Sequence, residues 1–171
     1  MNWELLLILV FLGIALLVIG LVVGTASAKQ TGPAEADVEF ARAMSAHHRL
    51  ALRVAVAAGV RSSDSQIRLL AFEVETSRLE QIGRMAGWLD LWKREPAEDV
   101  AQPETRMSDV SFLHFMVLHD DKGIALADRA LATARLAPVR RFARKVRARQ
   151  LEERDAFAEV LAARDVRSAL R

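Results

Sequence analysis

The chain begins with a long apolar run, and its remainder alternates apolar and polar residues with a helical period. Leu5 to Val23 contains no charged residue. At about 1.5 Å per residue, a helix of this length can just cross a bilayer. A signal peptide usually has a shorter apolar core behind a positive N-terminus, whereas "MNWE" carries Glu4 and no Lys or Arg. The pattern favours a single N-terminal transmembrane anchor, residues 1–28, over a cleaved signal, although Ala26-Ser27-Ala28 has the spacing of a cleavage site.

Helices are predicted after the polar linker of residues 29–36, because apolar residues recur there at three- and four-residue spacing. Counting about 100° per residue, each predicted helix gathers small and apolar side chains into one stripe. The first stripe comprises Phe40, Met44, His47, Ala51, Ala55 and Ala58. The second comprises Ile67, Ala71, Val74, Ile82, Met85 and Leu89. Gly59 and "SSDS" separate the two helices, and Asp37, Glu35 or Thr31 is the expected N-cap of the first. No segment shows the alternation of a strand.

The two-helix pattern occurs twice. Residues 37–89 align without a gap on residues 109–161, at a constant offset of 72, and fourteen of the 53 aligned positions are identical. Met44 aligns with Met116 and His47 with His119. We therefore predict an all-α four-helix bundle over residues 37–165, built from two tandem helical hairpins. The hairpins cover residues 37–92 and 109–165, and the proline-containing connector covers residues 93–108.

Composition and charge limit which metal sites and which binding partners the protein can have. The chain has no Cys, which excludes disulfides and thiolate metal sites. The net charge is only +2, but six of the ten residues from Arg140 to Arg149 are basic. This cluster is either a solvated helix face or a contact for anionic lipid or another membrane protein. No recognition motif for nucleic acid accompanies it, so we expect no nucleic-acid partner. Residues 5–23 are expected to contact the lipid bilayer.

Histidine and methionine residues supply the candidate chemistry. Met44, His47 and His48, at i, i+3 and i+4, share one side of a helix, with His47 on the apolar stripe and His48 on its flank. The second half offers a similar set, and the bundle could bring both sets together at its centre. Imidazole and thioether suit copper above all and zinc less well. The candidate ligands are Met44, His47, His48, Met116, His119 and Asp120. The alternative is that these histidines are hydrogen-bonded core residues and the methionines fill the core.

Catalytic motifs are missing from the sequence. It contains no Tyr, no Glu-x-x-His of a carboxylate-bridged di-iron bundle, no His-Glu-x-x-His, no Gly-x-Ser-x-Gly and no phosphate-binding glycine loop. Nothing assembles a nucleophile, a base and an orienting group. We therefore expect a non-catalytic protein.

Two stretches, "DVEFARAMSAHHRLALRVA" and "LEQIGRMAGWLDLW", resemble the domain-of-unknown-function family numbered 305. The matching residues are Met44, His47, His48, Ala51, Ala55, Ile82, Met85, Trp88 and Leu89. The resemblance implies a duplicated, ferritin-like four-helix domain that binds metal, copper in particular, through His and Met residues. It also implies a secreted or anchored protein, hence a single-pass membrane protein with its bundle on the extracytoplasmic side. Lys29 alone would favour the cytoplasmic side.

The chain departs from the family pattern in both halves. Val54 and Leu126 stand where the family has Met after the histidines, and Phe157 replaces a Met of the last helix. The residues expected beside the metal, or in its place, are Arg78, Gln81, Gln150 and Glu153. Arg78 falls on the core stripe, and a buried arginine must be paired. We therefore expect Arg78 to pair with Asp120 or Glu153 where relatives hold metal. In that alternative, the protein is an accessory subunit of a membrane complex with a degenerate, metal-free site.

Overall fold

The computed structural model describes residue 3, residues 32–98 and residues 107–169 of the 171-residue chain. The predicted anchor at residues 5–23 lies outside the described residues. The chain divides into two units, Met1–Gly32 and Pro33–Arg171, and the second unit contains four helices. They are α2 (Glu35–Arg61), α3 (Ser65–Leu91), α4 (Asp109–Thr133) and α5 (Ala137–Ala169). The described residues contain no strand, which confirms the all-α prediction.

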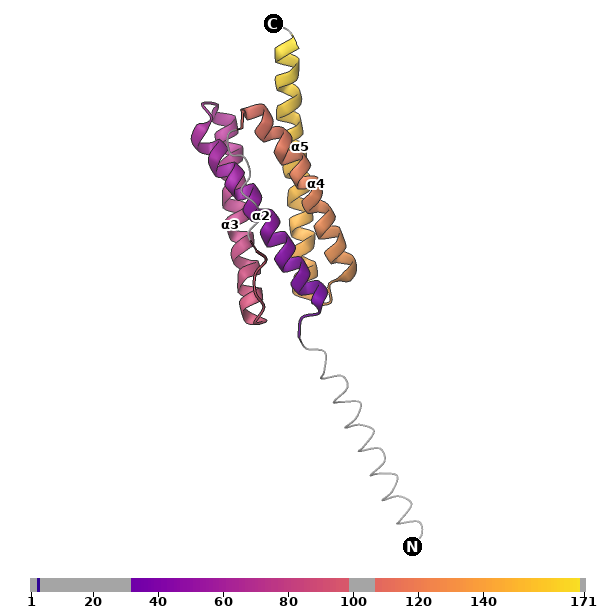
Figure 1. The fold of residues 1–171 in the computed structure, drawn as a ribbon. Coiled ribbons are helices and arrows are strands. Elements are labelled where there is room, and N and C mark those ends of the chain that lie inside the picture. The colour runs from indigo at the N-terminus through magenta and orange to yellow at the C-terminus, as the bar shows by residue number, and fades with distance from the viewer. Residues whose placement is uncertain (1–2, 4–31, 99–106, 170–171) are drawn as a thin grey trace. The chain divides into compact units, whose positions relative to one another are not determined.

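The four helices pack as two hairpins (Figure 1). α2 packs along α3 in the first hairpin and α4 along α5 in the second. A contact between α2 and α4 joins the two hairpins, so α2 lies between α3 and α4. No helix in the described part of the chain combines the length and apolarity that crossing a membrane requires.

Local sequence explains where the helices start and stop. Asp64 caps α3, because its side chain accepts hydrogen bonds from the backbone N–H groups of Gln66, at 2.8 Å, and Ile67, at 3.4 Å. Ser108 caps α4 by accepting from the N–H of Ser111 at 3.1 Å. Pro138 lies in the first turn of α5, where its missing N–H costs nothing.

Asp37 has a different role from the expected one. The N-cap of α2 is Ala34, so none of Asp37, Glu35 and Thr31 occupies the cap position, and that prediction was wrong. Asp37 accepts from the N–H of Ala34 at 2.8 Å. Its other oxygen accepts from the N–H groups of Arg135 and Leu136, both at 3.0 Å. The buried carboxylate therefore fastens the start of α2 to the turn that precedes α5.

The core consists of two apolar clusters with polar residues between them. The first cluster includes Val38, Met44, Met85, Leu89, Ala127, Val139 and Phe142. The second includes Ala51, Val54, Ile67, Val74, Phe112, Met116 and Phe157. Between these two sets, every helix contributes one or two buried polar residues near its middle. We call them the polar layer: His48, Arg78, His119, Asp120, Gln150 and Glu153. The layer contains most of the predicted site residues.

Candidate functional site

Arg78 stands at the centre of the polar layer. Its Nη2 lies 3.1 Å from Oδ1 of Asp120 and 2.5 Å from Oε2 of Glu153. The exposed fractions of these three side chains are 0%, 0% and 8%, so both contacts of Arg78 are shielded from water. Three helices, α3, α4 and α5, thus meet through one guanidinium group. The expectation that Arg78 pairs with Asp120 or Glu153 is confirmed, and it pairs with both.

One guanidinium cannot compensate two buried carboxylates fully. The pKa of Asp120 is raised to about 8, chiefly by burial and also by the charge of Glu153, against the charge of Arg78 and its hydrogen bond. Glu153 has a second cation, since Nε of Arg149 donates to its Oε1 at 2.9 Å. Asp120 therefore keeps its proton at neutral pH. Its Oδ2 has no hydrogen-bond partner among the described residues.

His47 of α2 faces His119 of α4. The rings of His47 and His119 are stacked, with centroids 3.6 Å apart and an angle of 8° between their planes. The His48 ring lies 5.7 Å from that of His47, and Phe115 covers His119 at 5.3 Å. His47 is half-buried and His48 is fully buried, the reverse of their expected places on the stripe and its flank. The reason is that α2 packs against two helices, so its buried arc is wider than one stripe.

All three imidazoles are kept neutral. Burial lowers the pKa of His47 to about 3, and the charges of Arg78 and Lys122 act in the same direction. Burial lowers the pKa of His119 to about 2, with His47 and Arg78 adding to the effect. The pKa of His48 is also lowered, by burial first and by Arg78 second. Neutral imidazole is the protonation state that binds metal ions.

Several buried nitrogens of these rings lack hydrogen-bond partners. Among them are Nε2 of His47 and Nε2 of His119, considered within the described residues. The side chain of Gln81 lies beside the His48 ring, and its hydrogen bond acts to raise the pKa of His48. Buried polar atoms are nearly always satisfied in folded proteins, so unpartnered ones point to a missing water or ion. The donor set therefore fits a metal that accepts imidazole.

The methionines are not brought to the same place. Met44 is fully buried in the first apolar cluster and Met116 in the second. They lie on opposite sides of the polar layer, each about one helical turn from a histidine of its own helix. Within the described residues, no group of three or more His, Asp or Glu side chains is arranged to hold a metal ion. Of the six predicted ligands, the three imidazoles thus lie close together. Asp120 is bound to Arg78 instead, and the two thioethers are far from each other.

Gly123, which sequence reasoning did not single out, makes room for Gln150. A Cβ at Gly123 would lie 2.3 Å from both terminal atoms of the Gln150 side chain. Gln150 is fully buried, and neither its Oε1 nor its Nε2 has a partner among the described residues. The signal in the sequence was slight: Gly123 aligns with Ala51, another small residue on the stripe. The polar layer thus holds a further unpartnered amide beside its ion pairs.

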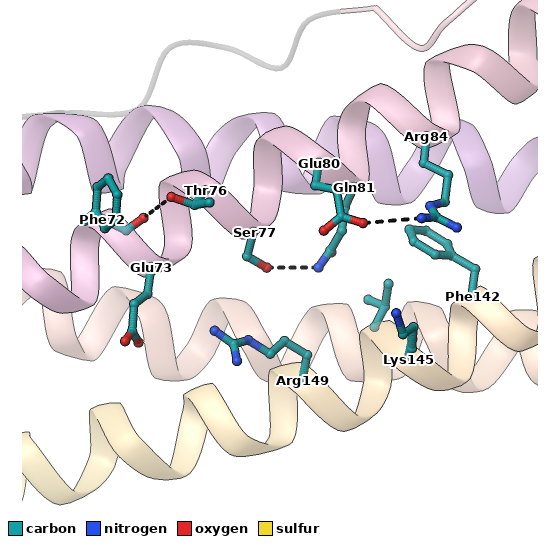
Figure 2. Close-up of a pocket in the computed structure, with 11 residues that line it drawn as sticks. Phe72, Glu73, Thr76, Ser77, Glu80, Gln81, Arg84, Phe142, Lys145 and Arg149 are labelled. Atoms are coloured by element: carbon teal, nitrogen blue, oxygen red, sulfur yellow. Dashed lines mark hydrogen bonds and ion pairs between the residues drawn. The ribbon is translucent and has the colours of Figure 1, made fainter.

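A groove between α3 and α5 lies beside this layer. It encloses about 660 Å³ and is lined from both helices (Figure 2). Figure 2 shows Ser77 and Gln81 on α3 across from Arg149 on α5. Ser77 accepts hydrogen bonds from Gln81, at 2.9 Å, and from Arg78, at 3.3 Å. Arg149 and Ser77 bond directly to the layer, so the groove borders it, although none of the six polar-layer residues lines the groove.

Fold and site together define a class: an all-α four-helix bundle with a buried polar centre of neutral imidazoles around an arginine–carboxylate cluster. Residues 37–109 match the family model described as Domain of unknown function (DUF305). The resemblance predicted from the sequence is thereby confirmed. No curated protein matches the chain.

Solved structures, two of them described as DUF305 proteins, share the fold. A DUF305 fragment from Deinococcus radiodurans is 25% identical, with a TM-score of 0.71 over 77% of this chain and 99% of that one. A DUF305 protein from Streptomyces coelicolor is 26% identical, with a TM-score of 0.71 over 76% and 94%. CopM in its Cu(II)-bound form is 15% identical, with a TM-score of 0.63 over 74% and 96%, a likeness of fold alone.

Proposed function

We propose that this protein is a non-catalytic, membrane-anchored module that binds a soft metal ion, copper in preference, through the imidazoles of its centre. The metal is cargo to be held or handed on, and no chemical step is assigned to it. The soluble bundle is proposed to lie on the extracytoplasmic side of the membrane.

The unpartnered Nε2 atoms of His47 and His119 carry this proposal. An imidazole binds metal in the plane of its ring, and the two rings are parallel, so one of them has to turn about its side-chain bonds before both bind the same ion. Both rings are neutral, and each has an unpartnered buried Nε2. His47 is half-buried, so a metal can reach the pair without the bundle unfolding. Imidazole suits copper and zinc, and thioether selects Cu(I). His47 and His119 would be the principal ligands and His48 would lie behind them, while Met44 or Met116 could join only after a side-chain rearrangement.

The comparisons support the metal and the location only indirectly. CopM, which shares the fold, has been solved with Cu(II) bound. The Streptomyces coelicolor protein is described as a candidate secreted protein. The uncharged run from Leu5 to Val23 is long enough to span a bilayer, which is why we propose an anchor instead of secretion.

A second candidate function follows from Arg78. Its guanidinium is buried beside the histidines and would repel a cation brought to them. In this alternative, the ion pairs replace the metal, and the bundle serves as an accessory subunit of a larger membrane complex.

Metal titration of the full-length chain in detergent tests the first proposal. We would measure metal content after purification, then titrate Cu(I) against a competing chelator, and titrate Cu(II) separately. Submicromolar copper binding is expected in the wild type. The variant His47→Ala/His119→Ala should bind at least about a hundredfold more weakly, because loss of a metal's orienting partners alone costs 10–100-fold. His114→Ala is the matched control, since His114 is exposed on α4 and should not matter.

Arg78→Gln separates the two candidates. If Arg78 excludes the metal, this variant should bind copper where the wild type does not. Weak binding in both proteins would count against a metal at this layer altogether. Tight binding in the wild type that survives loss of both histidines would overturn the assignment of the ligands.

A further inference from the structure

The basic cluster on α5 separates into paired and unpaired residues. Arg140 donates to the backbone oxygen of Ala134 at 2.8 Å, which satisfies the end of α4. Arg147 pairs with Asp128 at 2.6 Å and Arg149 with Glu153 at 2.9 Å. The other three are exposed and have no ion-pair partner in the described part of the chain: Arg141, Arg144 and Lys145. At i, i+3 and i+4 they share one side of α5, which we call the basic face.

Aromatic and apolar side chains from α3 adjoin the basic face. The rings of Trp88 and of Phe142 on α5 pack edge to face, with centroids 5.3 Å apart. Trp92 stacks on Trp88 at 5.9 Å. Just before it, Leu91 is 76% exposed. The aromatic pair and the exposed leucine therefore lie at the end of the bundle where α5 and its basic face begin. This combination is typical of a surface that contacts lipid headgroups.

The same end of the bundle receives the chain from its N-terminal side. The carboxylate of Asp37 binds the turn before α5, and Val38 and Val139 share the first apolar cluster. Residues 24–32, nine in number, separate the apolar run from Pro33. The chain therefore enters the bundle at the end where α5, and with it the basic face, begins.

We propose that the basic face, with Leu91 and Trp92, docks on the anionic lipid headgroups of the membrane that holds the anchor. The inference rests on the anchoring proposed above. Each Lys or Arg near an anionic surface favours the docked state roughly fivefold, so three of them favour it about a hundredfold. Docking would fix the orientation of the bundle. It would also place the α3–α5 groove, which Lys145 helps to line, close to the headgroups.

Energy transfer in reconstituted vesicles tests the docking. The chain has no Cys, so Ala137→Cys and Ser63→Cys each give a single labelling site. Both positions are exposed, the first at the start of α5 and the second in the α2–α3 turn at the opposite end. The full chain would carry a donor at one site, and the vesicles an acceptor-labelled lipid. The vesicles would contain phosphatidylcholine alone or with phosphatidylglycerol.

We expect transfer from position 137 to exceed transfer from position 63 and to rise when phosphatidylglycerol is included. High salt should abolish the rise, because it screens exposed charges. Arg141→Gln/Arg144→Gln/Lys145→Gln should abolish it too, lowering the ratio of docked to undocked protein about a hundredfold. Arg147→Gln is the control on the same helix, because Arg147 already pairs with Asp128.

Two negative results have different meanings. Equal transfer from both positions, indifferent to phosphatidylglycerol, would overturn the docking while leaving the anchor and the metal site intact. A chain that does not float with the vesicles at all would overturn the anchoring, and the docking with it.

Discussion

His47 and His119 stack face to face at the bundle centre, 3.6 Å between ring centroids and 8° between ring planes. The two rings come from aligned positions of the two hairpins, on α2 and α4. A proton on either ring would place a charge against the other and near Arg78, in a site with little water. The neutral state of the pair is therefore built into the packing, and it has consequences for stability.

On acidification, the bundle should begin to lose stability at a higher pH than a helical protein without buried neutral histidines. The pKa of His47 is about 3 and that of His119 about 2 in the folded state, against 6.5 without the fold. Between these values the unfolded chain binds more protons, so the free energy of unfolding falls as pH falls. Each histidine contributes up to about 1.4 kcal/mol per pH unit. Urea denaturation at successive pH values below 6.5 measures the slope. His119→Gln should make it shallower, whereas the exposed His114→Gln should leave it unchanged.

Asp120 should produce the opposite trend on the alkaline side. Its pKa is about 8 in the folded state and 3.8 in the reference state. Between these values the folded protein binds the extra proton, so the free energy of unfolding falls as pH rises. Below pH 6.5 the effect of Asp120 partly offsets that of the histidines, and above pH 6.5 the effect of Asp120 acts alone. The free energy of unfolding should therefore be highest near pH 6.5. Asp120→Asn mimics the protonated acid and should flatten the alkaline decline in melting temperature. Asp121→Asn, at an exposed neighbour, should not, and a decline that survives Asp120→Asn would contradict the assignment.

The sequence predicted the helices and the polar centre better than it predicted the ligand geometry. Helical periodicity located the hairpins, and a charge on an apolar stripe required a partner for Arg78. The prediction that Met44 and Met116 meet at one site was wrong for a geometric reason. Each precedes its histidine by three residues, but α2 and α4 run in opposite directions, so the two thioethers lie on opposite sides of the layer. Asp37 was misassigned because capping rules consider only neighbouring residues, whereas Asp37 bonds to residues nearly a hundred positions away.

Arg78→Met should cost about 3–5 kcal/mol at a pH near neutrality, the usual cost of removing one partner of a buried ion pair. The physical reason is that Glu153 would remain buried beside Asp120 with only the half-exposed Arg149 as its counter-charge. Chemical denaturation monitored by circular dichroism gives the value. The double variant Arg78→Met/Glu153→Met should recover much of the lost free energy of unfolding. Asp120 is already protonated, so no unpaired carboxylate would remain in the polar layer. Arg84→Met removes the exposed pair between Arg84 and Glu80, 3.3 Å apart, and should cost at most about 1 kcal/mol. If Arg78→Met proved as mild as Arg84→Met, the cluster would not be a buried ionic one.

Asp37→Ala should destabilise the protein by about 2–4 kcal/mol. It removes the acceptor of two backbone N–H groups, those of Arg135 and Leu136, and leaving a buried donor unpaired costs about 1–3 kcal/mol. Asp37→Asn keeps one acceptor oxygen and should lose less. Amide hydrogen exchange provides the direct readout, since protection at positions 135 and 136 should fall in the alanine variant and largely persist in the asparagine one. Unchanged protection in Asp37→Ala would mean that the turn is held by other contacts.

Gly123 and Gly83 should respond in opposite ways to alanine. At Gly83 no atom lies within 4 Å of a new Cβ, so Gly83→Ala should gain about 0.5–1 kcal/mol from helix propensity. At Gly123 the new Cβ would meet the buried amide of Gln150 at 2.3 Å, and overpacking of this kind costs about 1–3 kcal/mol. The cost should largely disappear when the two variants Gly123→Ala and Gln150→Ala are combined, because the obstructing side chain is gone. A double-mutant cycle of unfolding free energies measures this coupling, which should be at least about 0.5 kcal/mol. Simple additivity would show that Gln150 does not lie over Gly123, and the unpartnered amide would then have no place in the polar layer.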